Sequence, residues 1–147
     1  MLPPITLHAS PNNPRQSGRV VEVIDGNTVR ALIKDTGLVY TVRYIGVAVP
    51  VDEIYSVAAE HKNTALAYAK EVIFIKDVND KDERGRLLRY VLVGDKFINL
   101  EMIQQGLGTA LDVPPDSACA QVFKQAEQAA NASKNGTWSL STPPKSP

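Results

Sequence analysis

Short segments rich in β-branched and apolar residues, separated by polar turns, fill much of the first two thirds of the chain. Within residues 39–44 the side chains of Tyr40, Val42 and Tyr44 alternate with those of Val39, Thr41 and Arg43. Alternation with a period of two is typical of a strand that turns one face to the core. Turn residues at 25–27 join the first two segments as a hairpin. The pattern predicts five strands, at residues 18–24, 28–34, 38–47, 72–75 and 87–93.

Helical spacing replaces the alternation after Pro50. The apolar residues Val57, Ala58, Leu66 and Ala69 follow this spacing, and charged residues take the other face. Two further helices are predicted, at residues 100–105 and 118–133, because a glycine follows each of them. Five strands with a helix between the third and the fourth, and helices afterwards, indicate an α+β fold. The most economical arrangement is a five-stranded OB-fold β-barrel with three packed helices.

Composition is that of one ordinary globular domain. The chain has 147 residues, of which 44% are hydrophobic and 22% charged. Residues 1–17 and 141–147 are rich in proline and polar residues and are predicted to be tails around a domain at 18–140. No apolar run approaches the roughly 20 residues of a membrane span. The proline-rich start also suits a chain that a leader once preceded, which leaves export and localisation open.

Charge and single residues add limits on function. Sixteen basic and sixteen acidic side chains cancel, so any binding to nucleic acid is expected to be weak and sensitive to salt. Cys119 is the only cysteine and is expected to pack as a hydrophobic residue. His61 is expected on the flank of a helix, and Trp138 is expected to pack back onto the barrel.

Several segments in order resemble the staphylococcal nuclease, or thermonuclease, family. They are residues 23–29, 42–51 and 82–91, followed by residues 98–100, 105–107 and 135–138. The resemblance covers about Gly18 to Trp138. It implies an OB-fold barrel with three helices and, in active members, a calcium-dependent nuclease that cuts phosphodiester bonds of DNA and RNA.

Two arginines of the family pattern are present. Arg43 matches the first phosphate-binding arginine and Arg86 the second, while Arg84 stands beside it as a further candidate. The planar guanidinium fork remains charged and suits phosphate oxygens. The resemblance therefore implies that a phosphate or other anion can still be bound.

The carboxylates of the family pattern are replaced. The metal-binding turn reads Asp-Gly-Asp-Thr in the family, but here Asp25 and Gly26 are followed by Asn27, which keeps an oxygen and loses the charge. Ala48 stands where the family has a second metal carboxylate, and Val51 where it has the general base. Hydrolysis needs both a metal and a base to activate water. We therefore expect no cofactor and little or no cleavage.

Three hypotheses of function remain open. The favoured one is an inactive nuclease-like domain that binds single-stranded nucleic acid or another phosphate-bearing ligand. The second is an active calcium-dependent nuclease in which Asp52 or Glu53 supplies the missing base. The third is a protein-interaction domain in which Asp25 and Asn27 only form a turn and the arginines pair internally with Asp82 or Glu83.

Overall fold

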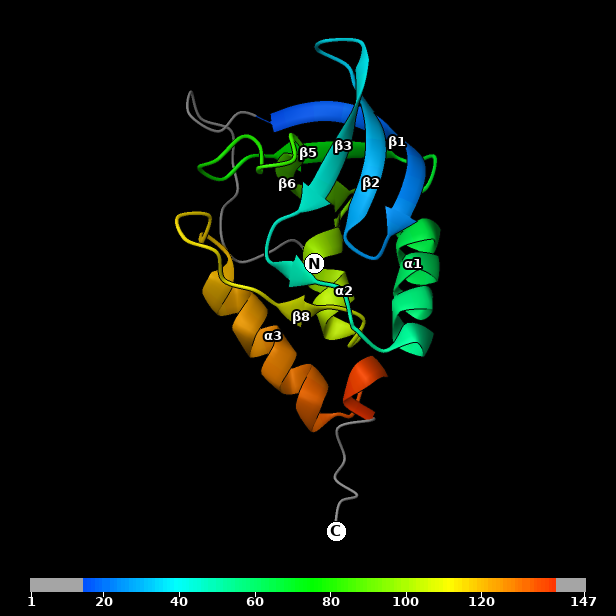
Figure 1. Cartoon of the computed structure of the whole chain (residues 1–147), viewed down its shortest axis with the longest axis vertical. Helices are drawn as coiled ribbons and strands as arrows, with labels where there is room; N and C mark the ends of the chain where they lie inside the picture. The colour runs from blue at the N-terminus through cyan, green and yellow to red at the C-terminus, as the bar shows by residue number, and fades with distance from the viewer. Residues whose placement is uncertain (1–14, 140–147) are drawn as a thin grey trace.

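The computed structural model describes residues 15–139 (Figure 1). Its strands are β1 (Arg15–Asp25), β2 (Thr28–Ile33), β3 (Leu38–Tyr44), β4 (Val47–Ala48), β5 (Glu71–Ile75), β6 (Leu87–Val93), β7 (Lys96–Phe97) and β8 (Thr109–Ala110). Its helices are α1 (Glu53–Ala67), α2 (Ile98–Gln104), α3 (Ala120–Ala132) and a 3-10 turn, η1 (Gly136–Ser139).

Five of these strands close into a barrel. The order is β3-β2-β1-β5-β6, and a parallel pairing of β3 with β6 joins the two ends of the sheet. The inner face of the barrel follows the predicted alternation, because Val29, Ala31 and Ile33 of β2 all point inward and are buried. The helices α2 and α3 lie below the barrel, and α1 lies beside β1 and β2 (Figure 1). The predicted α+β class, a five-stranded barrel with three helices, is confirmed.

Two of the predicted strands have a boundary that differs from the structure by three residues. Strand β1 begins at Arg15, which pairs with Ile75 of β5, so residues 15–17 belong to the barrel and not to a tail. The other residues of the predicted tails lie outside the described part of the chain. The predicted third strand is cut at Tyr44, because the chain turns at Gly46, where φ is +80° and an added Cβ would lie 2.6 Å from the ring of Phe123. The chain resumes as β4.

The buried face of α1 also differs from the prediction. Small residues and an amide face the barrel, namely Ala59, Asn63 and Ala67, whereas Val57 is 45% exposed. The reason is the close approach of the β1–β2 turn, where a Cβ on Gly26 would lie 2.6 Å from the Cβ of Ala59. Helical spacing therefore predicted the helix but not its face. None of the helices in residues 15–139 is long and apolar enough to cross a membrane.

Candidate functional site

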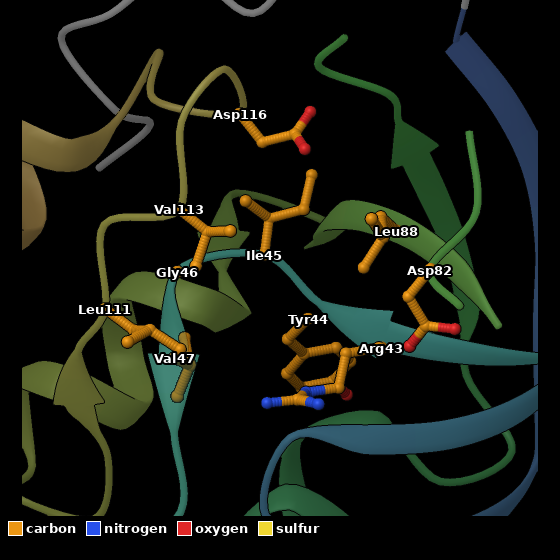
Figure 2. A pocket seen from close by; sticks show the side chains of 10 residues that line it. All are labelled: Arg43, Tyr44, Ile45, Gly46, Val47, Asp82, Leu88, Leu111, Val113 and Asp116. Atoms are coloured by element: carbon orange, nitrogen blue, oxygen red, sulfur yellow. The ribbon is translucent and has the colours of Figure 1, made fainter. Parts of the chain in front are cut away.

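Two hollows meet at Arg43, at the carboxyl end of β3. Arg43 pairs with Thr28 of β2 on one side and with Leu88 of β6 on the other. The polar hollow has a volume of about 460 Å³ and is lined by Arg43, Asp82, Glu83, Arg84 and Arg86. The apolar hollow, of about 160 Å³, is lined largely by aliphatic side chains such as Ile45 and Val113. Figure 2 shows Arg43 and Asp82 near one end of the apolar hollow and Asp116 at the other.

Asp82 fixes the loop that carries Arg84 and Arg86. Its Oδ1 accepts hydrogen bonds from the backbone N–H groups of Arg84 and Arg86, at 2.9 and 3.0 Å. Its Oδ2 accepts a bond of 2.7 Å from Nε of Arg86. Burial opposes ionisation of Asp82, but the bonds from Arg86 outweigh it and hold the pKa of the carboxyl below its usual value. The guanidinium of Arg86 is thus oriented through Nε, and its terminal nitrogens make no hydrogen bond within residues 15–139.

Among the arginines of the site, only Arg43 has a buried donor without an acceptor in the described residues. Its Nε is buried and has no hydrogen-bond acceptor within the described residues. Burial and the nearby charge of Arg86 lower the pKa of Arg43, while Asp25 and Asp82 oppose this shift. A bound anion would supply the missing acceptor and offset the repulsion between the guanidinium groups.

Two buried charged residues, which the sequence did not reveal as site residues, hold residues 78–80. These residues begin the segment, here called the arginine loop, that carries Arg84 and Arg86. The guanidinium of Arg89 is only 4% exposed; it donates to the carbonyl and the carboxylate of Asp80, at 3.0 and 2.7 Å. Asp116 accepts the backbone N–H groups of Val78 and Asn79, at 2.9 and 2.8 Å. An arginine inside the apolar run 87–93 was a visible signal for Arg89, whereas nothing in the local sequence marked Asp116.

The residues that remain at the predicted metal position form internal hydrogen bonds. Oδ1 of Asp25 accepts the backbone N–H of Asn27 at 2.9 Å. The side chain of Asn27 is buried, and its oxygen accepts the hydroxyl of Thr28 at 2.8 Å. Ala48 and Val51 contribute no side-chain oxygen, and Val51 is fully exposed.

Calcium takes six to eight oxygen ligands, several of them usually carboxylates. Within residues 15–139 no group of three or more His, Cys, Asp or Glu side chains gathers in a way that could hold a metal ion. Among the side chains at positions 25, 27, 48 and 51, only Asp25 carries a carboxylate and only Asn27 adds an amide oxygen, so this donor set falls short of the oxygen ligands that calcium takes.

The two carboxylates proposed as a relocated base stand at the start of α1. Asp52 is the N-cap of the helix, and its Oδ1 accepts the backbone N–H groups of Ile54 and Tyr55, at 2.9 and 3.3 Å. Glu53 is exposed in the first turn. Neither residue lines a hollow that contains Arg43. The structure thus gathers Arg43, Arg84 and Arg86 and leaves Asp52 and Glu53 outside their hollow.

Cys119, His61 and Trp138 lie outside the two hollows that meet at Arg43. Cys119 is buried, as predicted. His61 is exposed on α1. Trp138 lies in η1, after the last helix, where it lines an apolar hollow of about 500 Å³ together with Ala48, Pro50 and neighbouring residues.

Comparison with known proteins gives one consistent result. Residues 41–140 match the family model described as staphylococcal nuclease homologue. The thermonuclease of Staphylococcus intermedius is 30% identical over 130 residues, which cover 84% of this chain and 76% of the relative. The thermonuclease of Staphylococcus hyicus is 29% identical over 136 residues, covering 87% and 79%. A prophage-derived endonuclease of Bacillus subtilis is 30% identical over 125 residues, covering 79% of this chain and 42% of the relative. The chain belongs to the staphylococcal nuclease family.

Proposed function

We propose that this chain is a nuclease-family domain that binds a phosphate group of single-stranded nucleic acid at Arg43, Arg84 and Arg86 and does not cleave it through a calcium site. The observation that carries the proposal is the buried Nε of Arg43, which lacks an acceptor within residues 15–139. Two more guanidinium groups line the same hollow. Charge-assisted hydrogen bonds from arginine to phosphate are short and strong, so a phosphate oxygen is the acceptor that this arrangement suits best.

Nucleic acid is favoured over a free anion because a second hollow adjoins the arginines. Its aliphatic wall offers room for the organic part of a phosphate ester. The nuclease relatives make a nucleotide the natural choice for that part. With no net charge on the chain, binding rests on these few arginines and falls steeply with added salt.

Loss of cleavage follows from the side chains that stand where charge is needed. In a metal-dependent nuclease the metal ion would lower the pKa of a bound water and neutralise charge on the phosphate, while a base takes the proton of that water. Here Asn27, Ala48 and Val51 supply neither a metal-binding carboxylate nor a base. The absence of the base alone costs about 10² to 10⁴ in rate.

A second candidate function is an active nuclease, and the relatives favour it, since they are named thermonucleases and endonucleases. Of the two available carboxylates, Glu53 is the better base, because its side chain makes no hydrogen bond within the described residues. Asp52 would have to abandon the helix cap, at a cost of about 0.5 to 2 kcal/mol. Either carboxylate would also have to move to the arginine hollow.

One experiment separates these candidates. Single-stranded DNA and RNA are incubated with the protein in millimolar calcium and in chelator, beside the triple variant Asn27→Asp, Ala48→Asp, Val51→Glu. Binding is measured on the same oligonucleotides, with the double variant Arg43→Ala, Arg86→Ala as the control. The proposal expects binding that the double variant loses, no cleavage by the natural sequence, and cleavage by the triple variant.

Other outcomes lead to other conclusions. Calcium-dependent cleavage by the natural sequence, lost in Glu53→Gln, would establish the second candidate. If neither the natural sequence nor the double variant binds any oligonucleotide, the proposed phosphate site is refuted. A protein-interaction domain is then favoured.

A further inference from the structure

A buried asparagine joins the β1–β2 turn to the segment that follows Arg43. The backbone carbonyl of Asn27 accepts the N–H of Tyr44 at 2.8 Å, directly after Arg43. The side-chain Nδ2 of Asn27 donates to the carbonyl of Val47 at 2.9 Å, across the turn between β3 and β4. Asn27 is only 4% exposed, so these bonds are shielded from water. The residue therefore holds the chain at two points within four residues of Arg43.

We propose that Asn27 is a positioning residue of the arginine site, whose amide locks the β3–β4 corner and so fixes the backbone of Arg43 without a cation. The inference rests on the proposed binding of phosphate by Arg43. It means that Asn27 contributes to phosphate binding by positioning Arg43, and is not merely a residue that replaces a metal-binding aspartate.

Neighbouring hydrogen bonds engage the other carbonyls of the corner. The amide of Asn99 donates to the carbonyl of Ile45 at 2.9 Å, and Gly46 accepts the N–H of Leu111 at 3.0 Å. Together with the bond from Asn27 to Val47, the carbonyls of three successive corner residues are all engaged. The backbone beyond Arg43 is thus held at each residue, and the bond to Val47 is the one that Asn27 supplies.

A second amide supports the turn on which Asn27 stands. Asn63 of α1 donates to the carbonyl of Asp25 at 2.8 Å and accepts the hydroxyl of Tyr44 at 2.6 Å. The turn and the end of β3 therefore share two buried amides, one from each side. Since all these groups are neutral donors and acceptors that satisfy one another, the arrangement needs no bound ion.

An aspartate could not replace Asn27 in this arrangement. The carboxylate matches the amide in shape, but it has no N–H to give to Val47, and its second oxygen would face the carbonyl oxygen at hydrogen-bond distance. The hydroxyl of Thr28 already binds the amide oxygen, which leaves Nδ2 directed at Val47. The donor that locks the corner and a metal-binding carboxylate are therefore mutually exclusive at this position.

The test compares Asn27→Asp with the milder Thr28→Val, which removes the hydroxyl that orients the amide and adds no charge. Inorganic phosphate is titrated while the ¹⁵N signal of Arg43 Nε is followed by NMR, at a temperature at which every protein is folded. Asn131→Asp controls for the added charge, because Asn131 is exposed on α3. Val72→Ala controls for lost stability, because Val72 is buried on β5 and lines neither hollow at Arg43.

We expect Asn27→Asp to weaken phosphate binding about tenfold, equivalent to about 1.4 kcal/mol, and Thr28→Val to weaken it about threefold. Amide hydrogen exchange at Tyr44 should become faster in Asn27→Asp. Both controls, and addition of calcium or chelator to the natural sequence, should leave phosphate binding unchanged.

Equal phosphate affinity in the natural sequence, Asn27→Asp and Thr28→Val would overturn this inference and leave the proposed function standing. If Asn27→Asp does not fold, the affinity of Thr28→Val decides alone. A natural sequence that does not bind phosphate at all would overturn both, and a natural sequence that needs calcium to bind it would overturn the claim that no cation is required.

Discussion

Asp116 is expected to determine both the stability of the domain and the position of the arginine loop. Asp116 is buried, with only 6% of the residue exposed, and it lies at the end of the apolar hollow opposite Arg43 (Figure 2). Oδ1 accepts two backbone N–H groups, from Val78 and Asn79, and Oδ2 accepts the side-chain N–H of Asn79 at 2.9 Å. These bonds tie the start of the segment leading to Arg86 to the segment that supplies Val113.

The cost of removing this carboxylate follows from the bonds that each variant loses. Asp116→Ala strands two backbone donors and one side-chain donor in a partly buried loop, at about 2 to 3 kcal/mol in total, because part of the loop can take up water. Asp116→Asn keeps the oxygen that accepts both backbone bonds and loses the charge and one bond, at about 1 kcal/mol. For a domain of this size about 1 kcal/mol lowers Tm by about 4 °C.

Thermal unfolding of both variants and phosphate titration at 20 °C check the reasoning. We expect Tm to fall by about 10 °C in Asp116→Ala and by about 4 °C in Asp116→Asn, with phosphate affinity lowered in the same order. Asp112→Ala is the matched control, because Asp112 is exposed on the same segment and accepts one bond, from Ser117. A Tm of Asp116→Ala within 2 °C of that control would refute the account, as would an asparagine variant as unstable as the alanine variant.

Three further predictions concern other parts of the domain. Burial raises the pKa of the Cys119 thiol to about 12 from 9.0, so the folded state holds this proton more tightly than the unfolded state. The contribution of this thiol to the free energy of unfolding should be present in full below about pH 9 and be lost as the pH rises toward 12. Urea unfolding at several pH values measures this loss, which should be smaller in Cys119→Ala. Gly26→Ala should lower the free energy of unfolding by more than about 2 kcal/mol, and Ala59→Gly should restore part of it in a double-mutant cycle. Arg84→Ala should reduce the slope of log affinity for single-stranded DNA against log salt by about 0.7; an unchanged slope would mean that Arg84 contacts no phosphate.

The sequence predicted those features that depend on local pattern. Alternation placed the strands, because a barrel strand such as β2 shows its inner face directly in every second residue. The arginines were predicted because Arg43 and Arg86 lie within short recognisable segments. The hydrogen bond from Asn27 to Val47 was not, because it joins residues twenty positions apart through a turn whose shape depends on the whole barrel. The buried face of α1 was mistaken for a related reason, since the approach of Gly26 to Ala59 favours small residues over the larger Val57.

The arginines proposed to bind phosphate and the positions of the missing carboxylates lie in parts of the fold that differ in how many contacts hold them. Arg43 stands in a strand paired on both sides, and Arg86 in a turn closed by Asp82, so the contacts that form the barrel also place the arginines. Ala48 ends β4, where it pairs with Thr109 of β8, whereas Val51 lies in the short connection from β4 to α1 and is fully exposed. A change of side chain there costs the fold little, because it removes few packing contacts. A carboxylate can therefore be lost at position 51 without disturbing Arg43 and Arg86, which is what the proposed binding without cleavage requires, whereas the names of the relatives favour an active nuclease.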